Sequence, residues 1–99
     1  MLSEWAVAEM QKESCAGLPF FGSVAKPEVG YGLTWWIDAK DRSGAPDQLS
    51  VAGAWGAIPW VNHTRGYAAF WLTYSNLPSS ADVWSETVPL LHAALDSPR

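Results

Sequence analysis

Residues 49–74 read LSVAGAWGAIPWV, then NHTRG, then YAAFWLTY. Two apolar, aromatic runs flank five residues that favour turns. Asn62 can hydrogen bond to its own backbone and Gly66 can take a positive φ, so the stretch predicts a β-hairpin with a bulge at Gly66. The step from Gly53 to Gly56 lets the first run bend sharply or change its place in the sheet.

One further strand is predicted before the hairpin. Tyr31–Ile37 alternates between two faces, with Tyr31, Leu33, Trp35 and Ile37 on one of them. Residues 16–30 are punctuated by Gly and Pro, and residues 38–47 are rich in charged and turn-forming residues. Both segments are therefore expected to be loops.

Helices are predicted at both ends of the chain. Ser3 is a suitable N-cap for a short helix that runs to about Lys12. A second helix is expected to open at Pro78-Ser79-Ser80, with Ser79 or Ser80 as its cap. Its apolar stripe consists of Trp84, Val88, Leu91 and Leu95. Pro89 lies inside this pattern and is expected to kink the helix near Ser85.

These elements predict a single α+β domain over residues 1–99. The expected architecture is a small antiparallel sheet, made of one strand plus the central hairpin, with the N- and C-terminal helices packed on one face. The strands are aromatic on both of their faces, as Trp35 with Trp36 and Phe70 with Trp71 illustrate. Two short helices cover one face, so something else must cover the other.

Composition narrows the classes of function. Apolar residues make up 48% of the chain and charged residues 16%, which argues against disorder and suggests too little polar surface for a lone small domain. A homo-oligomer or a missing partner chain is therefore expected. The net charge is −4 and the six basic residues are scattered along the chain, so nucleic acid is not expected as a partner.

Cofactors and membranes are not expected either. Cys15 is the single cysteine, so there is neither an internal disulfide nor a cysteine metal cluster, and no metal or cofactor is predicted. Asp38, Asp41 and Asp47 lack the spacing of a calcium loop and are expected to be solvated. No stretch is long and apolar enough for a membrane span, and the N-terminus lacks the basic region of a signal peptide, so a cytoplasmic location is the default expectation.

A series of motifs resembles a known superfamily. In chain order, the motifs are Tyr31-Gly32-Leu33-Thr34-Trp35-Trp36, Ser50 to Gly56, Pro59-Trp60-Val61-Asn62 and Arg65-Gly66. A hydrophobic strand and a closing helix follow them. This order resembles the C-terminal end of the serine β-lactamase-like hydrolases, which include class C β-lactamases, penicillin-binding proteins and esterases. The resemblance covers nearly all of this chain but only the last part of such an enzyme.

The resemblance implies an incomplete active site. The family uses a Ser-x-x-Lys nucleophile, a Tyr-x-Asn or Ser-x-Asn motif, and a Lys-Thr-Gly or His-x-Gly strand that lines the pocket. The third motif falls on Val51-Ala52-Gly53, where Val51 replaces the Lys or His. Some esterase-like members of the family carry a variant of this third motif, and Ser50 to Gly56 resembles that variant. The pocket or motif positions implied are Ser50, Val51, Gly53, Trp55 and Gly56, and no catalytic residue is assigned.

Other pattern matches have simpler explanations. Ser23-Val24-Ala25-Lys26 reads as Ser-x-x-Lys, but Pro27 disfavours a helix at Lys26, and a solvated loop is expected. Tyr74-Ser75-Asn76 reads as Tyr-x-Asn, and a strand end with a turn is expected there. His63 is expected to be a solvated turn residue, and His92 a partly exposed helix residue.

Three functional hypotheses remain open. The first is a truncated β-lactamase-like domain that lacks the nucleophile, is not catalytic alone, and acts through self-association or binding. The second is a complementing fragment of a split serine hydrolase. The third is a small-molecule-binding module for an apolar ligand, built on the seven tryptophans and above all on Trp55, because that residue lies between two glycines at the motif position.

Overall fold

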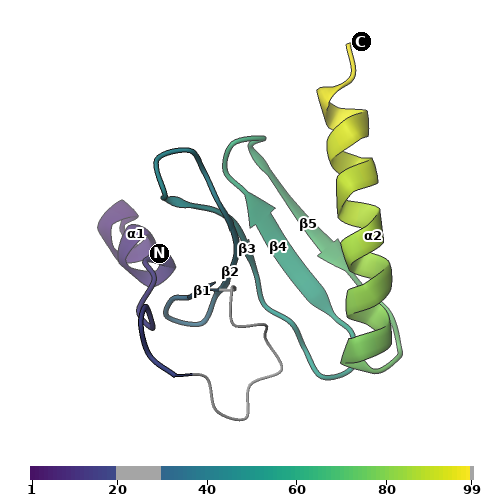
Figure 1. The fold of residues 1–99 in the computed structure, drawn as a ribbon, viewed down its shortest axis with the longest axis horizontal. Helices are drawn as coiled ribbons and strands as arrows, with labels where there is room; N and C mark the ends of the chain where they lie inside the picture. The colour runs from purple at the N-terminus through teal and green to yellow at the C-terminus, as the bar shows by residue number, and fades with distance from the viewer. Residues whose placement is uncertain (20–29, 99) are drawn as a thin grey trace.

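The computed structural model of the chain describes residues 1–19 and 30–98. Figure 1 shows a sheet with one helix at each end of the chain. The elements are α1 (Glu4–Gln11), β1 (Gly30–Tyr31), β2 (Trp36–Lys40), β3 (Pro46–Ser50), β4 (Ile58–Asn62), β5 (Tyr67–Trp71) and α2 (Leu77–Asp96). The predicted α+β class, with an antiparallel sheet and terminal helices, is confirmed.

The sheet has five strands instead of one strand and a hairpin. Its order is β1-β2-β3-β4-β5, and every neighbouring pair is antiparallel. The predicted strand over residues 31–37 is wrong in its bounds, because Thr34 takes a φ of 79° and turns the chain between β1 and β2. The predicted loop over residues 38–47 is likewise too long, since β2 continues to Lys40 and β3 begins at Pro46.

The central stretch divides where its glycines predicted a bend. Its first run forms the end of β3, a turn, and β4, and these two strands pair with each other. The β4–β5 hairpin forms as expected, with Gly66 at a φ of 65° in the turn. Register runs without a shift from Ile58↔Trp71 to Asn62↔Tyr67, so Gly66 belongs to the turn and not to a bulge within the strands.

Capping residues define where both helices begin. The Ser3 side chain accepts a hydrogen bond from the Ala6 backbone amide at 3.2 Å, as predicted for α1. The cap of α2 is Asn76 and not Ser79 or Ser80: its side chain accepts from the Ser79 amide at 3.0 Å. α2 then runs continuously through Pro89 to Asp96.

The strand register assigns side chains to two faces. Trp36, Ser50, Trp60 and Ala69 lie in one row across the sheet and therefore share the face that we call the inner face. Ile37, Leu49, Val61 and Ala68 form the neighbouring row on the opposite, outer face. Since successive residues of a strand point to opposite sides, each face continues along its strands.

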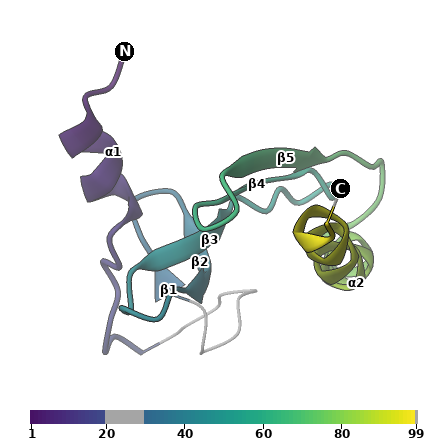
Figure 2. The same ribbon diagram turned by 90° about the horizontal axis from the view of Figure 1, so that it is seen from above.

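The two helices lie on different sides of this sheet, where one shared face was expected (Figure 2). α2 packs on the inner face under β4 and β5, with the Trp84 ring edge-on to Trp60 at 5.9 Å between centroids. The segment that ends α1 crosses the other side, where the Leu33 amide donates to the Met10 carbonyl at 2.9 Å. The sequence pattern could not distinguish these sides because the strands are apolar on both faces.

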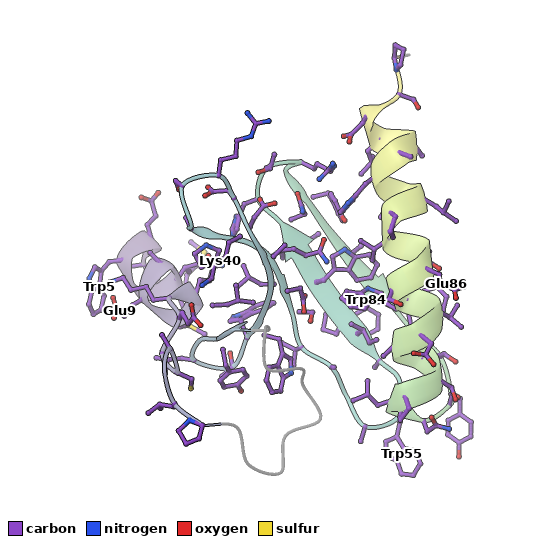
Figure 3. All side chains as sticks on the ribbon, in the orientation of Figure 1. Trp5, Glu9, Lys40, Trp55, Trp84 and Glu86 are labelled. Carbon is purple, nitrogen blue, oxygen red and sulfur yellow. The ribbon has the colours of Figure 1, made fainter. Side chains whose placement is uncertain are left out.

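The core is small. The apolar side chains that are buried are Ile37, Leu49, Ile58, Trp60 and Val88. None of the residues of α1 is buried, and Trp5 points away from the sheet (Figure 3). A helix of eight residues gains little stability from its own hydrogen bonds, so α1 depends on the contacts at its C-terminal end.

Candidate functional site

Of the motif residues predicted from the family resemblance, Ser50 ends β3 and the other four lie in the turn between β3 and β4. The Gly53 amide donates to the Ala57 carbonyl and the Gly56 amide to the Gly53 carbonyl, both at 2.9 Å. Gly56 has a φ of 88°, and a Cβ there would lie 2.1 Å from Ser80 Oγ. Glycine is required at this position because the turn packs directly against the beginning of α2.

The predicted residues differ in how far they are exposed. Trp55 is 74% exposed and points away from the sheet near the N-terminal end of α2 (Figure 3). Val51 is also exposed, whereas Ser50 is buried on the inner face. The Trp55 carbonyl accepts from the Ser75 amide at 3.2 Å, and the Ala54 carbonyl from the Leu77 amide at 3.0 Å. Through these two hydrogen bonds, the backbone of the motif anchors the connection between β5 and α2.

Ser50 instead belongs to a polar group that the sequence analysis did not find. It lies beside the half-buried carboxyl group of Asp38 on β2. Burial raises the pKa of Asp38 to about 6, and the Ser50 side chain partly opposes this shift. The Asp38 Oδ2 atom is buried without a hydrogen-bond partner among the residues described. Asp38 was expected to be solvated because the predicted strand ended one residue before it.

Regular strand alternation places this acid on the inner face, and a β-bulge beside it interrupts the pairing of β2 with β3. The register shifts between Ile37 and Ala39, so β2 carries one extra residue opposite β3. Asp38 lies two residues after Trp36 and therefore on the same inner face, next to Ser50. Extending the period-2 alternation by two positions beyond Trp36 would have indicated this placement.

A second polar group joins α2 to the sheet. The Trp60 indole N–H donates to the Tyr67 hydroxyl oxygen at 3.0 Å, and that hydroxyl lies 2.7 Å from His92 Nε2. Burial lowers the pKa of His92, and the nearby Arg65 lowers it further. A neutral His92 with its proton on Nδ1 accepts a hydrogen bond from the Tyr67 hydroxyl at Nε2, so the hydroxyl is held by both neighbours. His92 is thus a structural contact of α2, which the sequence could not show because Tyr67 is 25 residues away.

An ion pair closes the same end of the helix. Arg65 Nη2 lies 2.7 Å from Asp96 Oδ2, and Arg65 Nε donates to both carboxylate oxygens. This pairing lowers the pKa of Asp96. The hairpin turn and the C-terminal end of α2 are held together by this bidentate contact and by the Tyr67–His92 bond.

The remaining predicted candidates lie apart from one another. His63 is exposed in the hairpin turn and lies 3.0 Å from Gln11 Oε1. Asp41 accepts from the Ser43 and Ala45 amides in its own turn, while Asp47 accepts from the Thr64 amide at 2.7 Å. Across residues 1–19 and 30–98, no cluster of three or more His, Cys, Asp or Glu residues could hold a metal. The Ser23 to Lys26 match lies outside the described residues.

The described polar groups do not form a hydrolase constellation. Acyl transfer needs a nucleophile within hydrogen-bond reach of a base. Here the buried Ser50 lies beside Asp38, and His92 is hydrogen bonded to the Tyr67 hydroxyl. Lys40 forms an ion pair with Glu13 beside α1 (Figure 3). The arrangement is one of structural hydrogen bonds between strands and helices.

The most distinctive exposed feature is the free edge of β5. Within the described sheet, β5 pairs with β4 alone, and Figure 2 shows no element beyond it at this edge. Its residues Tyr67-Ala68-Ala69-Phe70-Trp71 carry no charge and no proline, and their register is regular. Edge strands are usually blunted by lysine, proline or bulges, and β5 has none of these devices.

Exposed apolar side chains lie on β5 and directly after it, and α2 exposes others. Phe70 on the outer face is 58% exposed, and Leu72 beyond the strand is 75% exposed. α2 adds Val83 and Leu90, which are exposed although they are aliphatic. We call the edge of β5 together with these side chains the β5 surface.

No family model, no curated protein sequence and no solved structure matches the chain. Neither described helix is long and apolar enough to cross a membrane.

Proposed function

We propose that this chain is a non-catalytic assembly domain that self-associates through the β5 surface. The open, uncharged edge of β5 with its exposed apolar neighbours carries the proposal. The edge presents unpaired backbone donors and acceptors, which another strand would satisfy. The resemblance to serine β-lactamase-like hydrolases then describes the origin of the fold and not an activity.

The accessible surface of the chain supports the same proposal. A compact monomer of 10.8 kDa is expected to expose about 5,500 Å², whereas this chain exposes 7069 Å². The excess is larger than the roughly 800 Å² that each partner contributes to an interface of standard size. Association would bring the exposed area per chain toward the value typical of its mass.

The partner favoured here is a second copy of the chain. Two molecules with a net charge of −4 repel each other, so their contact surface must be free of acidic side chains. No residue of β5 is charged, and neither are the other side chains of the β5 surface, Leu72, Val83 and Leu90. An identical antiparallel strand is moreover self-complementary in its backbone.

The test is the mass of the purified chain by light scattering after size exclusion at micromolar concentration. A discrete species of about 22 kDa, twice the chain mass of 10.8 kDa, or a larger closed oligomer is expected. A monomer that binds no apolar dye would refute self-association.

A second candidate is a complementing chain of a split serine hydrolase. It is favoured by α1, which exposes Trp5 and buries none of its side chains. Such a helix would find its packing on a partner chain that also supplies the nucleophile. Co-purification with a second polypeptide in place of a homodimer would favour this function over self-association.

A further inference from the structure

We infer that two copies pair their β5 strands about a twofold axis at Ala69, and that the same axis packs α2 against α2 of the second copy. This inference rests on the proposed self-association and specifies its geometry. The result would be one continuous ten-stranded sheet with both α2 helices side by side on its inner face. Three observations lead to it.

The first observation is the length and regularity of β5. An antiparallel pairing centred on Ala69 aligns all five residues of Tyr67–Trp71 with their copies, and a shift by one or more residues pairs fewer of them. In this register Phe70 faces Ala68 of the partner on the outer face. Tyr67 faces Trp71 of the partner on the inner face. Large side chains thus oppose small ones outside, and aromatic pairs form inside.

The second observation is the position of α2. Figure 2 shows α2 beneath β4 and β5, at the margin of the sheet next to the open edge. A twofold axis perpendicular to the sheet at this edge keeps both helices on the same face and makes them antiparallel. Strand pairing therefore brings a helix–helix contact with it.

The third observation is the side of α2 that faces the open edge. Trp84 and Val88 define the sheet-facing side, because Trp84 contacts Trp60 and Val88 is buried. Figure 2 views α2 from its C-terminal end, from which a right-handed helix advances anticlockwise by about 100° per residue. A residue that directly precedes a sheet-facing residue in the sequence is therefore turned clockwise from it, toward the open edge of β5.

These edge-facing positions form an uncharged stripe. They are Val83, Thr87, Leu90 and Ala94, at the spacing i, i+4, i+7 and i+11. Val83 is 48% exposed and Leu90 71% exposed. Small and aliphatic residues at this spacing are typical of a seam between antiparallel helices. Glu86, in contrast, points away from the sheet in Figure 3 and would remain in solvent.

Cysteine scanning along β5 tests the strand register. The background variant is Cys15→Ser, which removes the native thiol. In the inferred register Ala69→Cys lies opposite itself and is expected to give the highest yield of disulfide-linked dimer under mild oxidation. Ala68→Cys and Phe70→Cys alone should cross-link less, while the double variant should cross-link well because these positions face each other across the axis.

Charge insertion on α2 tests the helix contact. Leu90→Lys is expected to weaken the dimer by about tenfold or more, because it places a like charge from each copy at the seam. Ser85→Lys is the matched control: it is exposed on the other side of α2 and should leave the dissociation constant within about twofold. Circular dichroism of both variants establishes that they remain folded.

The outcomes separate this inference from the proposed function. Efficient cross-linking at Ala69 together with weakening by Leu90→Lys supports the geometry. A dimer that is weakened by Leu90→Lys but does not cross-link along β5 overturns the geometry and leaves self-association through the β5 surface standing. A dimer that survives Leu90→Lys and does not cross-link along β5 overturns both. A wild-type monomer overturns both.

Discussion

Asp38 is the residue whose chemistry differs most from its expected role. A carboxyl group buried next to a single hydroxyl is more stable protonated, because the protein supplies too few donors to replace water. Its pKa of about 6 in the folded chain lies above the ordinary value of 3.8. The folded state therefore binds the proton more tightly than the unfolded state does.

The consequence for stability has a definite sign. Between pH 3.8 and 6 the folded state holds more protons than the unfolded state, so the stability contributed by Asp38 is present at low pH and is lost as the pH rises through this window. The shift corresponds to about 3 kcal/mol. We predict that Asp38→Asn raises the free energy of unfolding at pH 7 relative to wild type, and that this difference shrinks toward pH 4.

The measurement is urea unfolding of both proteins across this pH range at one protein concentration. Asp41→Asn is the matched control, because hydrogen bonds from Ser43 and Ala45 lower the pKa of Asp41 and so reverse the sign. Asp41→Asn should not raise the free energy of unfolding at any pH. An Asp38→Asn curve that runs parallel to wild type would contradict the assigned environment of Asp38.

At the level of elements, the docking of α2 depends on one hydroxyl. Tyr67 connects the indole N–H of Trp60 with the imidazole of His92, and so links β4, β5 and α2. Trp60 is 5% exposed, so its N–H has little access to water if the hydroxyl is removed. An unsatisfied buried donor costs about 1–3 kcal/mol.

We therefore predict that Tyr67→Phe lowers the free energy of unfolding by about 1–3 kcal/mol. Tyr74→Phe is the control, since Tyr74 is almost fully exposed and its change should stay within about 0.5 kcal/mol. Chemical denaturation at a fixed protein concentration measures both. Equal effects of the two substitutions would show that the Tyr67 hydroxyl contributes nothing to the packing of α2.

At the level of the whole molecule, stability should depend on protein concentration. If folding and association are linked, the melting temperature of the wild-type chain rises with concentration, because mass action favours the associated folded state. Leu90→Lys should have a lower melting temperature and a weaker dependence on concentration. Calorimetric scans over a hundredfold dilution measure this. A wild-type melting temperature that is constant over that range would argue for a self-sufficient monomer.

Much of the fold could be predicted from local sequence rules. The turn residues Asn62 to Gly66 predicted the β4–β5 hairpin, the step from Gly53 to Gly56 predicted a bend, and Ser3 was identified as a cap. Each of these signals acts within a few residues, so it survives in the folded chain. The second helix cap was missed because both Asn76 and the serines after it are good capping residues, and only the backbone decided between them.

The sequence by itself determined the α+β class, the hairpin and the presence of a helix at each end. Tertiary structure alone decided that the sheet has five strands, that Asp38 is partly buried beside Ser50, and that Tyr67 meets His92 across 25 residues. It also decided that the β5 edge stays open beside the exposed stripe of α2. The physical reason is that strand pairing and burial join residues far apart in the chain, and no local pattern specifies which of two apolar faces a helix will cover.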